Sequence, residues 1–181
     1  MTYAFTGFTT NAATATGWDN GNGVKWWQIN IVTTGYFSLD LSSKQTSSPT
    51  GPRDFKVQYR VGSGGTWTDL TGATSIVCSS TTSFATSARI TNVALPSTCD
   101  DQPSVFIRWI MTSNEDAQST IANVASGGTS RIDDIVVRGN TGGHYRSVTT
   151  GNWNSTSSWQ TSADLVTWYS AIAPPDFNAN T

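Results

Sequence analysis

The chain has 181 residues, enough for one or two domains, and no apolar run in it approaches the ~20 residues of a membrane span, so we expect no membrane insertion. Only 12% of the residues are charged and the formal net charge is −2, which excludes coiled coils and helical bundles and gives no electrostatic footprint for binding nucleic acid. The 29 threonines, 23 serines and eight tryptophans instead favour a soluble all-β protein.

Runs with an apolar residue at every second position recur along the chain, which is the pattern of half-buried β-strands. In the first half, the predicted strands cover residues 3–8, 25–33, 36–41 and 54–61. The alternation puts Trp26 and Trp27 on opposite faces of their strand, with Trp27 toward the core. It also puts Phe37, Leu39 and Leu41 together on one face of the next strand.

The predicted strands of the second half are separated by loops rich in Gly, Ser and Asn. They cover residues 66–70, 88–95, 105–111 and 131–138. The segment 105–111 is apolar on both faces, which favours a central strand in a sandwich. Since no segment keeps a 3.6-residue period over three turns, we expect residues 1–139 to form an all-β fold, a β-sandwich with the jelly roll as the leading topology.

Residues 140–181 differ in sequence pattern from the rest of the chain. The Gly-rich segment 139–143 is predicted to be a linker. The segment after this linker is too short for an ordinary core. We expect a short β-rich C-terminal extension, either a hairpin packed on the sandwich or the first segment of a truncated second module.

Cys78 and Cys99 are the two cysteines of the chain, and His144 is its one histidine, a set without the ligand spacing of a zinc site. Because residues 79–87, between the cysteines, are Ser/Thr-rich and predicted to be a loop, we expect one disulfide in an oxidising compartment; the alternative is two unpaired, half-buried thiols. After Met1 there is no charged-then-apolar stretch of a signal peptide. Either the protein is not exported or the chain begins after its signal.

Groups suited to covalent catalysis are sparse. The sequence has no Gly-x-Ser-x-Gly turn, and His144 lies in the predicted linker, which is a poor support for a Ser-His-Asp triad. Most of the 12 acidic residues lie at turns or strand ends, which disfavours an opposed pair of glycosidase carboxylates. We therefore expect a protein that is not an enzyme.

Three segments carry a resemblance to known proteins: QTSSPTGPRDFKVQYR at 45–60, VFIRWIMTSN at 105–114 and GGTSRIDDI at 127–135. In the residues of these segments and in the order of the segments along the chain, residues 1–139 resemble the jelly-roll, carbohydrate-binding-module-like domains of secreted multi-modular Bacteroidetes surface proteins. The resemblance implies an extracellular or cell-surface location, further modules in the same polypeptide, and a polysaccharide or surface glycan as partner. The stretch between Cys78 and Cys99 departs from the pattern as a local embellishment.

Glycan binding would need exposed aromatic rings, which stack on the C–H face of a sugar, and polar groups that bond its hydroxyls. The candidates are Trp26, Gln28, Arg60, Trp67 and Trp18. The alternative is that these tryptophans cap the sandwich or cover one sheet. We therefore expect a non-catalytic carbohydrate-binding-like module, and the alternative function is a structural or adhesive spacer of a cell-surface adhesin with no small ligand.

Asp133 and Asp134 are adjacent in the last predicted strand of the sandwich, so one of them must face inward or lie at an edge. The resemblance implies a structural Ca²⁺ near this strand, and calcium prefers hard oxygen ligands. The candidate ligands are Asp133, Asp134 and Asp19. The alternative is an internal ion pair between Asp133 and Arg131, which share a face.

Overall fold

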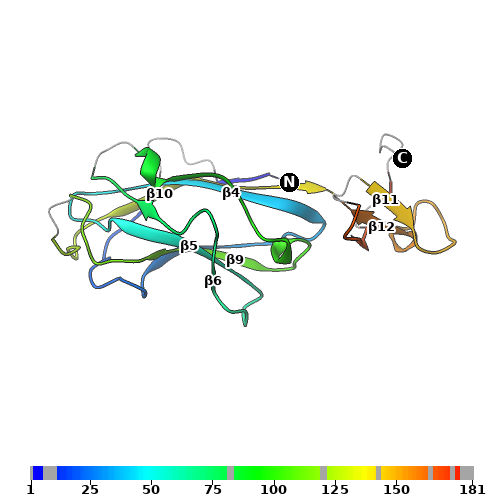
Figure 1. Cartoon of the computed structure of the whole chain (residues 1–181), viewed down its shortest axis with the longest axis horizontal. Helices are drawn as coiled ribbons and strands as arrows, with labels where there is room; N and C mark the ends of the chain where they lie inside the picture. Colours follow the sequence, from blue (N-terminus) through cyan, green and yellow to red (C-terminus); the bar gives the residue numbers. More distant parts are fainter. Residues whose placement is uncertain are drawn as a thin grey trace.

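The computed structural model describes residues 2–5, 12–80, 84–118, 122–141, 144–162, 165–171 and 174–175. This part of the chain is all-β, with two antiparallel sheets packed face to face and a third, small sheet beyond one end of them (Figure 1). The prediction of an all-β sandwich is confirmed. The first predicted strand, 3–8, is described only through Phe5, and residues 6–8 lie outside the described part.

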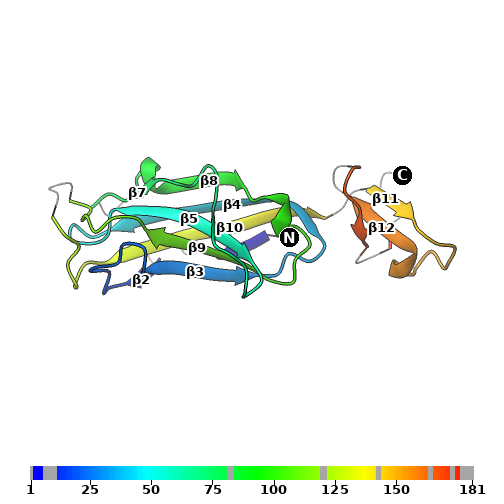
Figure 2. The same ribbon diagram turned by 60° about the horizontal axis from the view of Figure 1, so that its bottom comes forward.

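Sheet A has five strands. Four follow the spatial order β1 (Thr2–Phe5), β10 (Ser130–Thr141), β4 (Tyr36–Ser47) and β8 (Arg89–Ala94), and the fifth, β2 (Ala13–Ala15), also pairs with β10. Sheet B has the order β3 (Trp26–Ile31), β9 (Val105–Met111), β5 (Asp54–Val61) and β6 (Thr68–Asp69), and β7 (Ile76–Val77) also pairs with β5. Figure 2 shows the two sheets from a second side. Three short 3₁₀ turns join strands: η1 (Thr86–Ala88), η2 (Ser97–Cys99) and η3 (Thr156–Ser158).

The core lies between the two sheets and is built from the inward faces of their central strands. Trp109 of β9 is fully buried, and its indole N–H donates to the Ser43 hydroxyl of β4 across the sandwich at 3.0 Å. That bond satisfies the one polar atom of the ring in an otherwise apolar layer. The prediction that 105–111 is a central strand is confirmed, because β9 lies between β3 and β5.

The long strand β4 extends six residues beyond the predicted end at Leu41. Gln45, Thr46 and Ser47 are buried although they are polar, so the sequence pattern gives no sign that the strand continues. Near the other end a bulge sets two residues, Ser38 and Leu39, against one residue of β10.

This bulge overturns the prediction that Phe37 shares a face with Leu39 and Leu41. Phe37 pairs with Asn140, on the outward face of sheet A, whereas Leu39 lies in the core. Phe37 is nevertheless buried, because Tyr169 of the C-terminal sheet stacks on its ring with centroids 4.5 Å apart.

The C-terminal sheet consists of β11 (His144–Ser147), β12 (Trp159–Ser162) and β13 (Tyr169–Ser170), paired in that order. Gly139, Asn140 and Thr141, predicted to begin a linker, instead continue β10 and pair with β4. The stacked pair Phe37–Tyr169 joins the small sheet to the sandwich. In the described residues no helix is long and apolar enough to cross a membrane.

Cys78 and Cys99 are both free and buried, so the predicted disulfide is not formed. The Cys78 backbone N–H bonds Arg53, beside the end of β9 that carries Met111. The carbonyl of Cys99 accepts from Thr33, beside the opposite end of β9. A strand of this length spans roughly 20 Å, whereas a disulfide needs Cα atoms closer than about 7 Å.

We expect neither thiol to react with Ellman's reagent in the native protein at pH 8. Burial raises the pKa of Cys78 to about 12 and that of Cys99 to about 11, so almost no thiolate is present to attack the reagent. In guanidinium chloride both cysteines should react at once. Unfolded chains without a reactive thiol would show that the disulfide exists.

Candidate functional site: the outer face of sheet B

Five side chains on the outer face of sheet B form an aromatic–arginine cluster: Trp26 of β3, Phe106 and Arg108 of β9, Arg60 of β5, and Trp67 just before β6. The Arg108 guanidinium lies 4.1 Å from the Trp67 ring centroid and 4.9 Å from that of Trp26. The Arg60 guanidinium lies 4.6 Å from the rings of both Trp67 and Phe106. Each contact is a cation–π interaction, so the five side chains hold one another in place.

Polar bonds fix the cluster on the sheet. Arg108 donates through Nε and Nη2 to the Gln58 side-chain oxygen at 2.9 and 2.6 Å. Gln58 in turn donates to Asp69 at 2.6 Å, and Lys56 pairs with Asp69 at 2.9 Å. The hydrogen bonds from Lys56 and Gln58 hold the pKa of Asp69 below its usual range, so this carboxylate stays charged at neutral pH.

A pocket of about 310 Å³ opens beside Trp26, within the ~300–1,000 Å³ usual for small-ligand sites. Trp26 and Val24 are both strongly exposed in its lining, with 42% and 61% of their surface accessible. The lining consists of Thr16, Gly17, Trp18, Val24, Lys25 and Trp26. The pocket therefore combines an exposed indole with a hydroxyl, a backbone edge and an ammonium group.

The structure brings three of the five predicted glycan-binding residues, Trp26, Arg60 and Trp67, into one cluster. Gln28 is exposed on the same face and pairs in register with Arg108. Trp18 is different: it is only 4% exposed and packs against Trp27, with ring centroids 5.4 Å apart. Trp18 thus belongs to the core and also contributes to the lining of the pocket.

Arg108 and Phe106 complete the cluster, and sequence reasoning did not assign them to the site. The available signal was strand parity: once β3, β9 and β5 are neighbours, Gln28, Arg108 and Gln58 fall on one row. The order of the strands in the sheet cannot be predicted from any single segment. The alignment of Gln28, Arg108 and Gln58 in one row therefore could not be predicted from the sequence.

The predicted calcium ligands take part in separate ion pairs. Lys44 lies 3.4 Å from Asp133 and 2.6 Å from Asp134, while Asp19 pairs with Lys25 at 3.4 Å. Asp133 therefore forms an ion pair, as in the alternative to calcium ligation, but its partner is Lys44 in place of Arg131. Among the residues that the structure describes, no three metal-ligating side chains come together.

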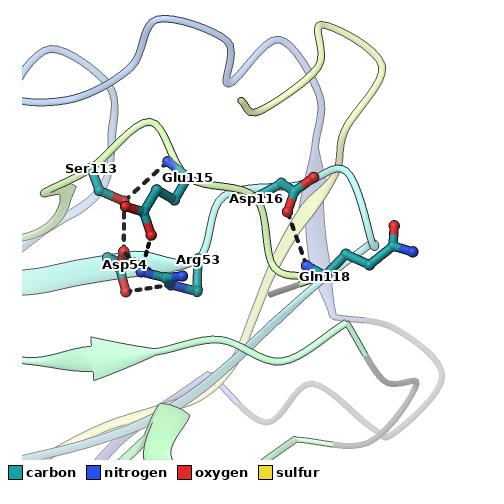
Figure 3. A network of polar contacts seen from close by, with 6 residues as sticks. All are labelled: Arg53, Asp54, Ser113, Glu115, Asp116 and Gln118. Atoms are coloured by element: carbon teal, nitrogen blue, oxygen red, sulfur yellow. Dashed lines mark hydrogen bonds and ion pairs between the residues drawn. The ribbon is translucent and has the colours of Figure 1, made fainter. Parts of the chain in front are cut away.

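A further polar network fastens the loop after β9 to the start of β5 (Figure 3). Arg53 pairs with Asp54 at 3.1 Å and with Glu115, and the Ser113 hydroxyl donates to Asp54 at 2.6 Å. The hydrogen bond with Asp54 raises the pKa of Arg53 above its ordinary, already high value. With Arg53 neutralising both carboxylates, the network serves to position the loop.

The outer face of sheet B offers noncovalent recognition: an exposed ring, immobilised guanidinium groups and amides, all on rigid strands. Its nearest titratable groups, Asp69 and Lys56, are bonded to each other, which leaves no free acid–base pair among the described residues of the cluster. Comparison of the chain with models of protein families, with curated proteins and with solved structures found no match.

Proposed function

We propose that this chain is a non-catalytic carbohydrate-binding module of a larger extracellular or cell-surface protein, and that it binds glycan at Trp26. The observation that carries the proposal is a tryptophan 42% exposed at the wall of a pocket of about 310 Å³. A single exposed ring is ordinary on a protein surface, and what distinguishes Trp26 is that it lines this pocket next to Val24, which is 61% exposed.

The ring of Trp26 is pre-oriented for stacking. Arg108 holds it through a cation–π contact, and Arg108 is itself fixed by two hydrogen bonds to Gln58. A ring that is already immobile loses little entropy when a ligand packs on it. Gln28 and Lys25 lie beside the ring and supply hydrogen bonds to sugar hydroxyl groups.

We also propose that the sandwich is a jelly roll, and the order of its strands supports this topology. From β3 in sheet B the chain passes to β4 in sheet A, then to β5, β6 and β7 in B, β8 in A, β9 in B and β10 in A. Two packed sheets visited in turn, each with four strands in its main path, are typical of the eight-stranded double-sheet jelly roll.

We expect Trp26→Ala to reduce glycan binding by at least tenfold without lowering the melting temperature by more than a few degrees. Stacking and burial of one indole are together worth about 1.5–3 kcal/mol. The measurement is retardation in native affinity gels that contain dextran, xylan, polygalacturonate or dextran sulfate.

The matched control is Trp153→Ala, because Trp153 is equally exposed, at 50%, but lies in the C-terminal part of the chain. Equal retardation of Trp26→Ala and the wild-type protein would remove Trp26 from the site. A wild-type protein retarded by none of the four polymers would favour the spacer function instead.

A further inference from the structure

We infer that the outer face of sheet B selects acidic glycans, whose carboxylate or sulfate groups pair with Arg60 and Arg108. The inference rests on the proposed function and adds the chemical class of the ligand. It starts from a charge imbalance within the aromatic–arginine cluster.

The outer face of sheet B carries an excess of positive charge although the whole chain is slightly negative, at −2. The cluster and its supporting bonds contain three cations, Lys56, Arg60 and Arg108, and one carboxylate, Asp69. Asp69 already forms an ion pair with Lys56, with the Lys56 Nζ atom 2.9 Å from the carboxylate. In the described part of the chain, no carboxylate lies within 4.0 Å of either arginine, so neither guanidinium group forms an ion pair.

Arg60 is held in place without being satisfied. Its guanidinium lies against the rings of Trp67 and Phe106, and its Nε is buried without a hydrogen-bond partner among the described residues. An unpaired buried donor on a charged group keeps the full penalty of its desolvation. A protein that keeps such a group on a binding face has an anion as the natural partner for it.

Arg108 is in a similar position, since its hydrogen-bond acceptor is the neutral amide of Gln58. Desolvation and the neighbouring charge of Arg60 lower its pKa, and the charge of Asp69 offsets only part of this effect, so the charged form of Arg108 is incompletely compensated. An arriving anion would relieve both effects. The two arginines are diagonal neighbours on adjacent strands, where side chains start roughly 7–8 Å apart, so one ligand can meet both.

The chemistry around the arginines favours an acidic sugar over other anions. Trp26 lies next to Arg108 and lines a pocket for a ring with C–H groups, and Gln28 lies beside them. A nucleic acid would require a broader basic surface, and only two unpaired cations are present among the described residues of the cluster. Uronic acids and sulfated sugars combine the stacking face with the anion.

The test uses two matched pairs of polymers in affinity gels: dextran with dextran sulfate, and methyl-esterified pectin with polygalacturonate. The wild-type protein should bind at least one acidic polymer tenfold or more tightly than its neutral partner, and 0.5 M NaCl should abolish the difference. Arg60→Met should remove most of this preference, since it deletes a charge-assisted hydrogen bond to the anionic group of the sugar. Arg60→Lys, which keeps the charge but not the planar fork, should restore it only in part.

Arg89→Met is the control, because it removes the same charge from an exposed position on sheet A. Equal binding of the acidic and neutral polymers would overturn the inference and leave the proposed function standing. Binding to none of these four polymers and not to xylan would overturn both. Retention by poly(dT) but by no glycan would also overturn the inference. If Arg60→Met fails to fold, the salt dependence of the wild-type preference alone decides the matter.

Discussion

Replacing Lys44 with methionine should lower the free energy of unfolding by about 3–5 kcal/mol, the usual cost of removing one partner from a buried ion pair. Lys44 is 16% exposed at its side chain, and the carboxylate of Asp133 is 1% exposed. Without the ammonium group, Asp133 keeps one bond, from the Asp134 backbone N–H at 2.8 Å, and its Oδ2 atom has no hydrogen-bond partner among the described residues. Urea unfolding followed by tryptophan fluorescence measures the loss.

The double variant Lys44→Met/Asp133→Asn should recover most of that stability, because it removes the uncompensated charge along with the cation. Asp134→Asn is the control, since Asp134 is 47% exposed and water replaces its pairing with Lys44. A Lys44→Met protein that unfolds like the wild type would contradict the ion-pair account. If chelation also lowers the melting temperature of the wild type, a Ca²⁺ ion compensates Asp133.

The pH dependence of this pair is set by its charges. The hydrogen bond with Asp134 raises the pKa of Lys44 above its ordinary 10.5, and the charge of Asp133 adds to the effect. A group whose pKa is raised on folding stabilises the fold fully below its unfolded pKa. The contribution of Lys44 is therefore complete at neutral pH and is lost as the pH rises through the folded pKa, above 10.5.

Strict alternation was sufficient to predict β5 and β9 to the residue. In both strands every inward position carries an apolar side chain, and flanking Gly, Pro or Ser residues end the pattern. The second half of β4 escaped prediction because its inward positions are polar. Ser43, for instance, is buried to accept the Trp109 indole N–H, and such a partner comes from a strand more than sixty residues away.

Bulges limit prediction in a different way. The bulge at Ser38 reverses the face of Phe37, and the one at Asp134 puts two residues of β10 against one of β4. Ser38 and Asp134 have φ values of 51° and 47°, the left-handed region that non-glycine residues seldom adopt. Neither serine nor aspartate requires such a conformation, so the sequence does not reveal where the bulges lie. A period-2 pattern that runs through an unrecognised bulge then assigns every residue beyond it to the wrong face.

The residues of the binding face could be predicted one strand at a time, but their contacts between strands could not. Outward parity on β3 and β5 identified Trp26, Gln28 and Arg60, and Trp67 was assigned from its place beside a turn. The contacts that organise these residues pass through Arg108, on a strand between them. The position of Trp18 could not be predicted from strand parity, because it lies in a loop without an alternating pattern. Its burial against Trp27 depends on how the loop folds back.

Gly128→Ala should destabilise the sandwich by several kcal/mol, comparable to severe overpacking of a core. A Cβ atom at Gly128 would overlap the backbone carbonyl group of Thr50 and the Cα atom of Gly51. The reverse is also true, since a Cβ at Gly51 would overlap the carbonyl of Thr129. The two loops therefore cross with backbone against backbone, and no flexible side chain is present among these described contacts to move aside.

Gly127→Ala provides the matched control, because a Cβ atom there would meet nothing within 4 Å among the described residues. That variant should unfold at the wild-type urea concentration or slightly above it, since alanine restricts the unfolded chain more than glycine does. The crossing is also tied by backbone bonds, from Ala125 N–H to Thr50 and from Ser48 N–H to Thr129, at 3.0 and 2.9 Å. The loops cannot separate to admit a methyl group without breaking these bonds next to the start of β10. Equal midpoints for Gly127→Ala and Gly128→Ala would mean that the loops do not cross in this way.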